Sequence, residues 1–426
     1  MASGATAFLG SASERLLPLS LPFRFFAAAV VFHMAAWVVL ALGANDLPDY
    51  AGGGGPVLAA IHLLTLGVFT MSAMGASLQL LPVATLQGFA APRLIAGIWW
   101  LFNLGSLILA LGMYFFWHRA MAAGGTLAGL AILLYLWLLI GNLRRGGVLV
   151  TVVAHGWLAV AALLGLLAVG LALIVTQEYN IFADAQRSAV SHMLVAAYGF
   201  MGLMAFGFSY VLVPMFALTQ VPGQKWALAS LGIGAIGLVI GLFGAWFGMD
   251  LCAAIGGCVG LLAAMIHLGL MEQALRKRMR KRLGPAFILI RLAWGLLPLS
   301  LLVGIAWALD LLGVRGGVIF SLSLLAWLLT FLLAILQRIV PFLASMHAAI
   351  AVKRCPPTVT ALTAQMPLNI HMYCHCASIL LLGAGIIWSQ TLMIVVAGLI
   401  GLVGAGAVAW FFQTAVRKYL AAVVST

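Results

Sequence analysis

The chain has 426 residues, of which 65% are hydrophobic and only 7% are charged, with a mean hydropathy of +1.20. This composition excludes an ordinary soluble domain and predicts an integral membrane protein surrounded by a lipid bilayer. The net charge of +13 is then best read through the side of the membrane on which each charge falls, and we expect no nucleic-acid partner.

Twelve apolar runs of about twenty residues, each long enough to cross a bilayer as a helix, follow one another along the chain. The first run follows a short polar start without an Ala-x-Ala cleavage site, so we expect a retained helix rather than a signal peptide. The predicted spans are 24–44, 56–83, 93–116, 120–143, 149–176, 188–218, 226–247, 251–275, 286–310, 316–346, 367–388 and 391–414.

Acidic and basic residues fall in alternate connections between these runs. One set of connections carries Asp46, Asp49, Glu178, Asp184, Asp250 and Asp310. The other set carries Arg144, Arg145, Lys225, Lys353, Arg354 and the basic run 276–282. The exceptions in the acidic set are Arg119, Arg187 and Arg315. Because positive residues mark cytoplasmic loops, the sequence predicts that the basic connections and both termini are cytoplasmic.

The second and sixth runs share a pattern of two glycines and a serine at fixed offsets before a proline. The residues are Gly67, Gly75, Ser77 and Pro82 in one run, and Gly199, Gly207, Ser209 and Pro214 in the other. The tenth run ends in Pro341 and keeps small residues, Ala326 and Ala334, at the glycine offsets. This spacing predicts one membrane domain made of three four-helix blocks, 1–148, 149–285 and 286–426. Small residues let helices approach closely, so these three runs should form an inner layer.

Histidines are the main candidates for chemistry, because no carboxylate lies deep in any predicted span, which also argues against a proton-coupled pump. His62 and His192 precede the repeated pattern at similar depth near the external side. Two level imidazoles on neighbouring inner helices could bind one haem iron from its two faces or share a metal ion such as copper. The alternative is that each imidazole only bonds a nearby backbone carbonyl.

A second candidate is a metal site made by His33, His371 and His375. His371 and His375 are four residues apart and therefore project from one face of a helix, with Cys374 and Cys376 beside the second histidine. His33 is midway along the first run, where an ionisable group indicates function. The alternative for the 371–375 pair is contact with lipid headgroups or water at the membrane surface.

The motifs His-Leu-Leu-Thr-Leu-Gly at 62–67, Gln-Leu-Leu-Pro at 79–82, Val-Pro-Met-Phe at 213–216 and Gln-Arg-Ile-Val-Pro-Phe at 337–342 carry a family resemblance. With twelve helices in three arcs, the chain resembles subunit I of the haem–copper oxidases, and more closely the short, divergent relatives of the cbb3-type subunit. The NnrS-like membrane haem proteins are a more distant comparison. The expected fold is an all-α membrane protein with three pseudo-repeated four-helix arcs.

The resemblance implies a haem b protein of the bacterial inner membrane, with a redox, sensing or nitrogen-oxide role and a partner membrane or cytochrome subunit. His62 matches the low-spin haem ligand of the family, and His192 matches a position that supplies a copper ligand. The chain departs from the family at 226–247, which has no histidine, and in the tenth run, where His347 stands alone. Oxygen reduction of the oxidase kind is therefore not expected.

Two other classes of function stay open. A secondary transporter with twelve helices commonly divides into two halves, which predicts self-similarity near residue 213 rather than the observed spacing of about 130 residues. The other class is an oxidase-like scaffold without cofactors that serves as a structural subunit.

Overall fold

The computed structural model describes residues 17–280, 283–352 and 355–424, and this part of the chain is helical, without strands. Within it, twelve helices are long and apolar enough to cross a membrane, which confirms the predicted all-α, multi-pass class. Lys353, Arg354 and residues 281–282 of the predicted basic connections lie outside the described residues.

The helices follow the order of the predicted spans, and two of the spans contain a π-helical segment. They are α2 (Ser20–Leu42); α3 (Pro56–His62), η1 (Leu63–Thr70) and α4 (Met71–Thr85); α5 (Pro92–Tyr114); α6 (His118–Leu143); α7 (Val150–Tyr179); α8 (Ala185–Leu194), η2 (Val195–Met201) and α9 (Gly202–Ala217); α10 (Gln224–Phe247); α11 (Asp250–Arg276); α12 (Pro285–Ala308); η3 (Gly313–Arg315) and α13 (Gly316–Ala351); the short α14 (Val359–Leu362); α15 (Gln365–Ile387); and α16 (Thr391–Val424).

Local sequence explains several helix ends. Proline is among the first residues of α3, α5 and α12, where its missing N–H breaks no intrahelical bond. Gly248 ends α10 in the left-handed conformation, with φ of +67°, and the N–H of Met249 bonds the carbonyl of Gly244 at 2.8 Å. This glycine cap allows the chain to turn directly into α11.

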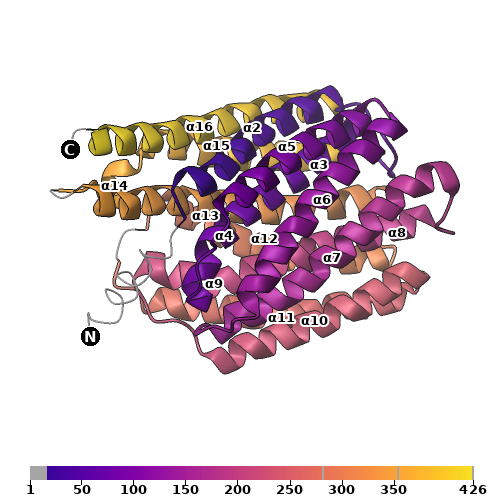
Figure 1. The fold of residues 1–426 in the computed structure, drawn as a ribbon. Coiled ribbons are helices and arrows are strands. Elements are labelled where there is room, and N and C mark those ends of the chain that lie inside the picture. The colour runs from indigo at the N-terminus through magenta and orange to yellow at the C-terminus, as the bar shows by residue number, and fades with distance from the viewer. Residues whose placement is uncertain (1–16, 281–282, 353–354, 425–426) are drawn as a thin grey trace.

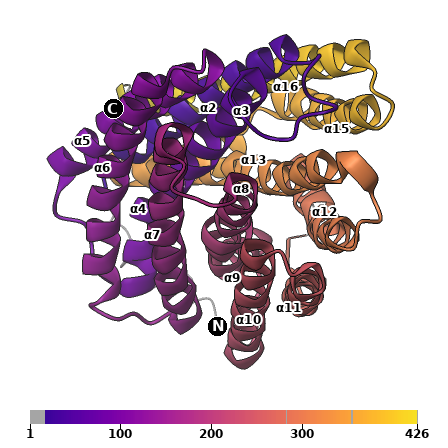
Figure 2. The same cartoon turned by 90° about the vertical axis from the view of Figure 1, so that its right-hand side faces the viewer.

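The helices close into a ring, which Figure 2 shows from one end of the bundle. α5 packs against α6, α10 against α11, and α15 against α16 as antiparallel hairpins. Three further contacts join these groups, since α6 packs on α7, α11 on α12, and α16 on α2. The last contact brings the two ends of the described chain together.

The second, sixth and tenth spans form the inner layer, as expected from their small residues. In each of them, 67% of the most apolar 18-residue stretch is buried, a larger share than in any other described span. α13 contacts η1, η2 and α9, so the three spans meet inside the ring. The ring therefore surrounds a core made by helices that are far apart in sequence.

Glycines allow each of the first two inner spans to approach the helix before it. A Cβ added to Gly67 would collide with Phe32 of α2, and one added to Gly75 would lie 2.9 Å from Phe25. The two segments η1 and η2 begin at the same distance before Pro82 and Pro214. π-helical segments often occur at functional sites. η1 begins directly after the predicted ligand His62, and η2 begins three residues after the predicted ligand His192.

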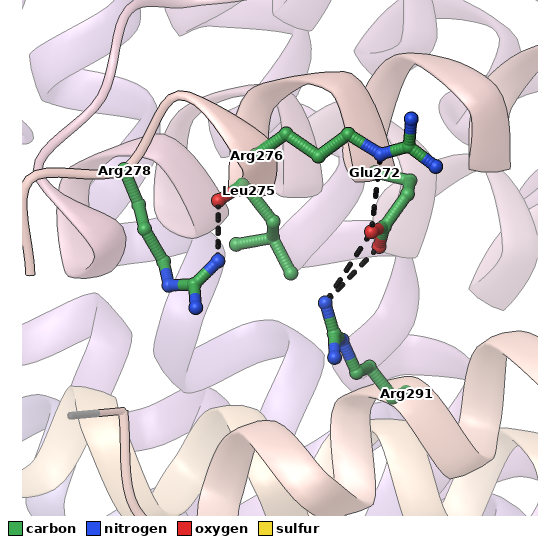
Figure 3. Close-up of polar contacts among 5 residues, drawn as sticks. All are labelled: Glu272, Leu275, Arg276, Arg278 and Arg291. Atoms are coloured by element: carbon green, nitrogen blue, oxygen red, sulfur yellow. Dashed lines mark hydrogen bonds and ion pairs between the residues drawn. The ribbon is translucent and has the colours of Figure 1, made fainter. Parts of the chain in front are cut away.

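Charges separate toward the two ends of the bundle. In Figure 1, α14 and the C-terminal end of α16 lie at one end, and α8 lies near the other. At the basic end, Glu272 of α11 forms ion pairs with Arg276 at 3.6 Å and with Arg291 of α12 at 3.3 Å, as Figure 3 shows. The pair with Arg291 joins α11 to α12.

Two of the three exceptional arginines have an acidic partner on their own side. Arg187 lies 3.1 Å from Asp184, and Arg315 lies 3.4 Å from Asp49. Neutralising partners explain how these arginines can occur in the acidic set of connections. The pairs are partly exposed, so we expect each to contribute at most about 1 kcal/mol.

Candidate functional site

The first candidate site contains His62 and His192. His62 is the last residue of α3, directly before η1, and His192 is near the end of α8, shortly before η2. Both side chains are half-buried. The two imidazoles lie close enough to interact electrostatically. The structure therefore places the two residues that the sequence predicts to share a cofactor within electrostatic range of each other, and ligation itself stays a prediction.

The hydrogen bonds of His62 prepare one ring nitrogen for a ligand. Nδ1 of His62 lies 3.0 Å from the carbonyl oxygen of Leu58, so Nδ1–H is the donor. In the neutral ring, Nε2 then carries the free lone pair. A metal-binding histidine usually donates its other ring N–H to a carbonyl or carboxylate in this way.

The ring of His192 packs against α7 at Gly170. A Cβ added to Gly170 would lie 2.9 Å from Cε1 of His192, so only glycine leaves room for the ring in this position. Nδ1 of His192 is buried and has no hydrogen-bond partner. A buried imidazole nitrogen without a partner is unfavourable, and a bound ligand would remove that penalty.

The second candidate site contains His33 of α2 with His371 and His375 of α15, all nearly fully buried. His33 lies within electrostatic range of His371 and His375, and the rings of His371 and His375 are 5.3 Å apart. Glycines of α16 make this arrangement possible, because Gly401 packs on Trp37 and Gly404 packs on Cys374. The structure thus places His33 within electrostatic range of the His371–His375 pair.

Hydrogen bonds give these three imidazoles different properties. Nε1 of Trp37 donates to Nε2 of His33 at 3.0 Å, which leaves Nδ1 of His33 as a buried donor without a partner. Nδ1 of His371 bonds the carbonyl of Gly404 at 3.3 Å, and its Nε2 has no partner. Nε2 of His375 lies 2.8 Å from the hydroxyl of Thr330 on α13. His371 is therefore the member with a free acceptor nitrogen.

Among the described residues, no three His, Cys, Asp or Glu side chains are arranged to hold one metal ion. The first candidate site contains one pair of imidazoles, and in the second the rings of His371 and His375 form another pair. Pairs of this kind suit an iron that already has four ligands from a macrocycle, since only two axial positions remain. The metal role of His33, His371 and His375 stays a prediction.

A third group of polar residues, which sequence reasoning did not single out, lies between α7, α9 and α11. Nδ1 of His267 lies 2.9 Å from the hydroxyl of Tyr210, and the His267 ring stacks on Phe206 at 3.9 Å. Nδ1 of His155 donates to the carbonyl of Thr151 at 2.7 Å, and Nε2 of His155 has no partner. In the sequence, only the repeated pattern pointed to this region. Gly207 belongs to that pattern, and in the structure it packs against His155.

No protein-family model matches the chain, and no curated protein matches it.

Proposed function

We propose that the protein is a haem-binding membrane protein with a redox role, in which His62 and His192 hold the iron of one haem b near the external side. The observation that carries the proposal is the approach of these two imidazoles from separate inner spans. His62 has its Nε2 free and Nδ1 of His192 is unpartnered, so both rings have a nitrogen available to a ligand.

The architecture supports a scaffold like that of haem–copper oxidase subunit I, divided into the blocks 1–148, 149–285 and 286–426. The fourth helix of each block packs on the first helix of the next, through α6 and α7, α11 and α12, and α16 and α2. The second helix of each block is its most buried span. These regularities favour three arcs over the two halves that are common in secondary transporters.

The chain's own residues would bind and orient the group and limit its contact with water. The Leu58 carbonyl fixes the tautomer and the ring direction of His62. Gly170 admits the ring of His192 beside α7. A bound haem would supply one-electron redox chemistry, tuned by its axial ligands and by burial. A partner cytochrome or membrane subunit would then exchange electrons with the site.

The second histidine group would serve as an additional metal or haem position. His371 has the free Nε2 that ligation requires, and His375 and His33 are its nearest imidazole neighbours. Copper is the alternative ion, because imidazole binds it well. An oxidase-like copper centre on the external side is not part of the proposal, since α10 contains no histidine.

The location that fits this role is the bacterial inner membrane, with both termini in the cytoplasm. The basic residues Arg144, Arg145 and Lys225 fall in one set of connections, and the acidic residues fall in the other. With this orientation His62 and His192 face the external half of the bilayer. Electron exchange with a partner on that side would then need no path across the whole membrane.

An absorption spectrum and a metal analysis of the purified protein, expressed with added haem precursor, test the proposal. We expect about one iron per chain and the sharp α band of a reduced six-coordinate haem b. Copper without haem absorbance would assign the histidines to a copper protein instead. Preparations without iron, copper or visible absorbance would refute the proposal and favour a cofactor-free scaffold or a transporter.

A further inference from the structure

A cavity of about 920 Å³ lies between the helices of the 149–285 block and the first two helices of the 286–426 block, and none of the five predicted ligands lines it. Its walls come from α7, α8, η2, α9, α10, α11, α12 and α13. Small residues dominate two of the walls, for example Gly234, Gly237, Gly241, Gly256, Gly260 and Ala263. Glycine and alanine leave the lining smooth and apolar, which suits a hydrocarbon ligand.

The cavity is long. Ser230 and Gly248 both line it, and they lie near opposite ends of α10. At 1.5 Å per residue the cavity therefore extends about 27 Å along α10. This shape accepts a chain or a narrow flat ring followed by a chain. A broad macrocycle with its iron on His155 would leave most of the length unfilled.

The external mouth of the cavity is charged. Asp184, Arg187, Asp250 and Asp310 line it, and Arg187 is already paired with Asp184 at 3.1 Å. The charges mark where the cavity meets the aqueous side. A molecule that enters deeper must leave these groups behind and carry little charge of its own.

The deep end has one unmatched polar atom, Nε2 of His155. The His155 side chain is 1% exposed and lines the cavity. Its Nδ1–H donates to Thr151, so Nε2 of the neutral ring is an acceptor, and it has no partner. The Tyr198 hydroxyl also lies along the cavity but is already bonded to Ser300 at 2.9 Å. The deep end therefore lacks one hydrogen-bond donor.

Aromatic side chains also line the cavity, at the level of His155 and further along it. Phe206 lies beside the repeated glycine that packs on His155, and Tyr198 stacks on Trp327 with ring centroids 5.6 Å apart. Aromatic faces favour a flat aromatic ring over a saturated head group. The missing donor and the aromatic lining together indicate a phenolic hydroxyl.

We propose that this cavity binds a lipid-soluble phenol with a long apolar chain, the chemical class that includes hydroquinones with hydrocarbon tails. The phenolic hydroxyl donates to Nε2 of His155, the ring lies beside Phe206, and the chain passes Tyr198 and Trp327 as it follows the glycine-lined slot toward the external mouth. A phospholipid would place its head at the charged mouth and leave Nε2 of His155 unpartnered. Binding requires no iron, so the proposal is independent of the haem.

Equilibrium binding of radiolabelled 4-dodecylphenol and of its methyl ether, measured on the full-length protein in detergent, tests the proposal. The ether keeps the ring and chain but has no donor. We expect the phenol to bind wild-type protein roughly fivefold to tenfold more tightly than the ether. In His155→Phe, which keeps a ring of similar size but removes the acceptor, the two ligands should bind equally.

A glycine pair separates cavity filling from general damage. A Cβ added to Gly165, which lines the cavity, meets no atom within 4 Å, so Gly165→Phe should fill the cavity and abolish binding of both ligands. Gly232→Phe is the matched control, because Gly232 is also open but does not line the cavity. Should Gly165→Phe elute as an aggregate, Gly165→Leu replaces it.

Equal affinity of wild-type protein for the phenol and the ether would overturn the proposal. Unchanged phenol binding by the folded Gly165 variant would do the same. Native mass spectrometry gives a third readout, because it detects phospholipid that stays bound to the protein. A phospholipid that is lost in the Gly165 variant, and that competes equally with the phenol and the ether, would overturn the proposal and assign the cavity to acyl chains.

Discussion

Gly207 of α9 lies so close to α7 that a Cβ added to it would be 2.7 Å from the Cβ of His155. Gly75 has the same relationship to Phe25 of α2, at 2.9 Å. Leucine at either position must push two packed helices apart, so Gly75→Leu and Gly207→Leu should each destabilise the protein by roughly 1–3 kcal/mol. Thermal unfolding in detergent would show this as a lower midpoint temperature.

Gly406→Leu on α16 is the control for this pair, because a Cβ there meets no atom within 4 Å. Its unfolding midpoint should stay close to that of the wild type. Unchanged midpoints for both inner-helix variants would mean that these helices are not tightly packed.

A buried hydrogen bond between Tyr135 of α6 and Ser77 of α4 gives a second prediction. The two hydroxyl oxygens are 2.6 Å apart, and the Ser77 hydroxyl also lies 3.1 Å from the carbonyl of Met74. Tyr135→Phe should lower the free energy of unfolding by about 0.5–1.5 kcal/mol, because Ser77 keeps its backbone partner. Tyr373→Phe, at a 70% exposed tyrosine, should change stability little, and an equal loss in both variants would contradict the prediction.

The topology gives a third prediction. A reporter fused after Asp184 should be external, and one fused after Arg278 should be cytoplasmic, because the charged connections alternate. Alkaline phosphatase is active only outside the cytoplasm, so the first fusion should be active and the second inactive. Activity of both fusions, or of neither, would refute the proposed orientation.

Tyr50, in the connection between α2 and α3, gives a prediction about pH. Burial raises the pKa of Tyr50 to about 12, and its hydroxyl donates to the carbonyl of Gly53 at 3.1 Å. The folded pKa is higher than the ordinary value near 10, so the contribution to stability is complete below pH 10 and is lost as pH rises toward 12. The difference in absorbance at 295 nm between wild type and Tyr50→Phe should titrate near pH 12. A transition near pH 10 would contradict the prediction.

Hydropathy predicts the spans well because a bilayer demands about twenty apolar residues from each of them. The boundaries differ where a charged side chain lies inside a helix. The first predicted span begins at residue 24, whereas α2 begins at Ser20, since Arg24 bonds the Ser20 carbonyl at 3.3 Å and its guanidinium lies 5.7 Å from the Trp99 ring. A basic residue near a helix end can reach the interface in this way.

The candidate sites were predictable only in part. Matching positions of His62 and His192 in a repeated pattern predicted that the two residues lie level, because the pattern sets their depth. The convergence of His33 with His371 depends on the contact of α16 with α2, which closes the ring between distant parts of the chain. The spacing of residues within one span cannot predict a contact between helices that are so far apart in the sequence. The π-helical form of η1 was also unpredicted, since its residues fit an α-helix equally well.

The last prediction concerns the histidines as ligands and uses four variants of the haem-loaded protein. His62→Ala and His192→Ala each remove one axial ligand of the proposed haem, so the reduced spectrum should change from six-coordinate to five-coordinate or disappear. His371→Ala and His347→Ala are the comparison variants, because neither residue belongs to the external pair.

If one haem lies between His62 and His192, the two comparison variants keep the wild-type α band. If the haem instead lies at the His33, His371 and His375 group, His371→Ala loses the band, and the external variants keep it. Loss of bound copper from His192→Ala with an unchanged haem spectrum would show that His192 holds a separate metal ion, as in the oxidase-like arrangement. The bis-histidine assignment therefore requires that both external variants, and neither comparison variant, change the spectrum of the reduced protein.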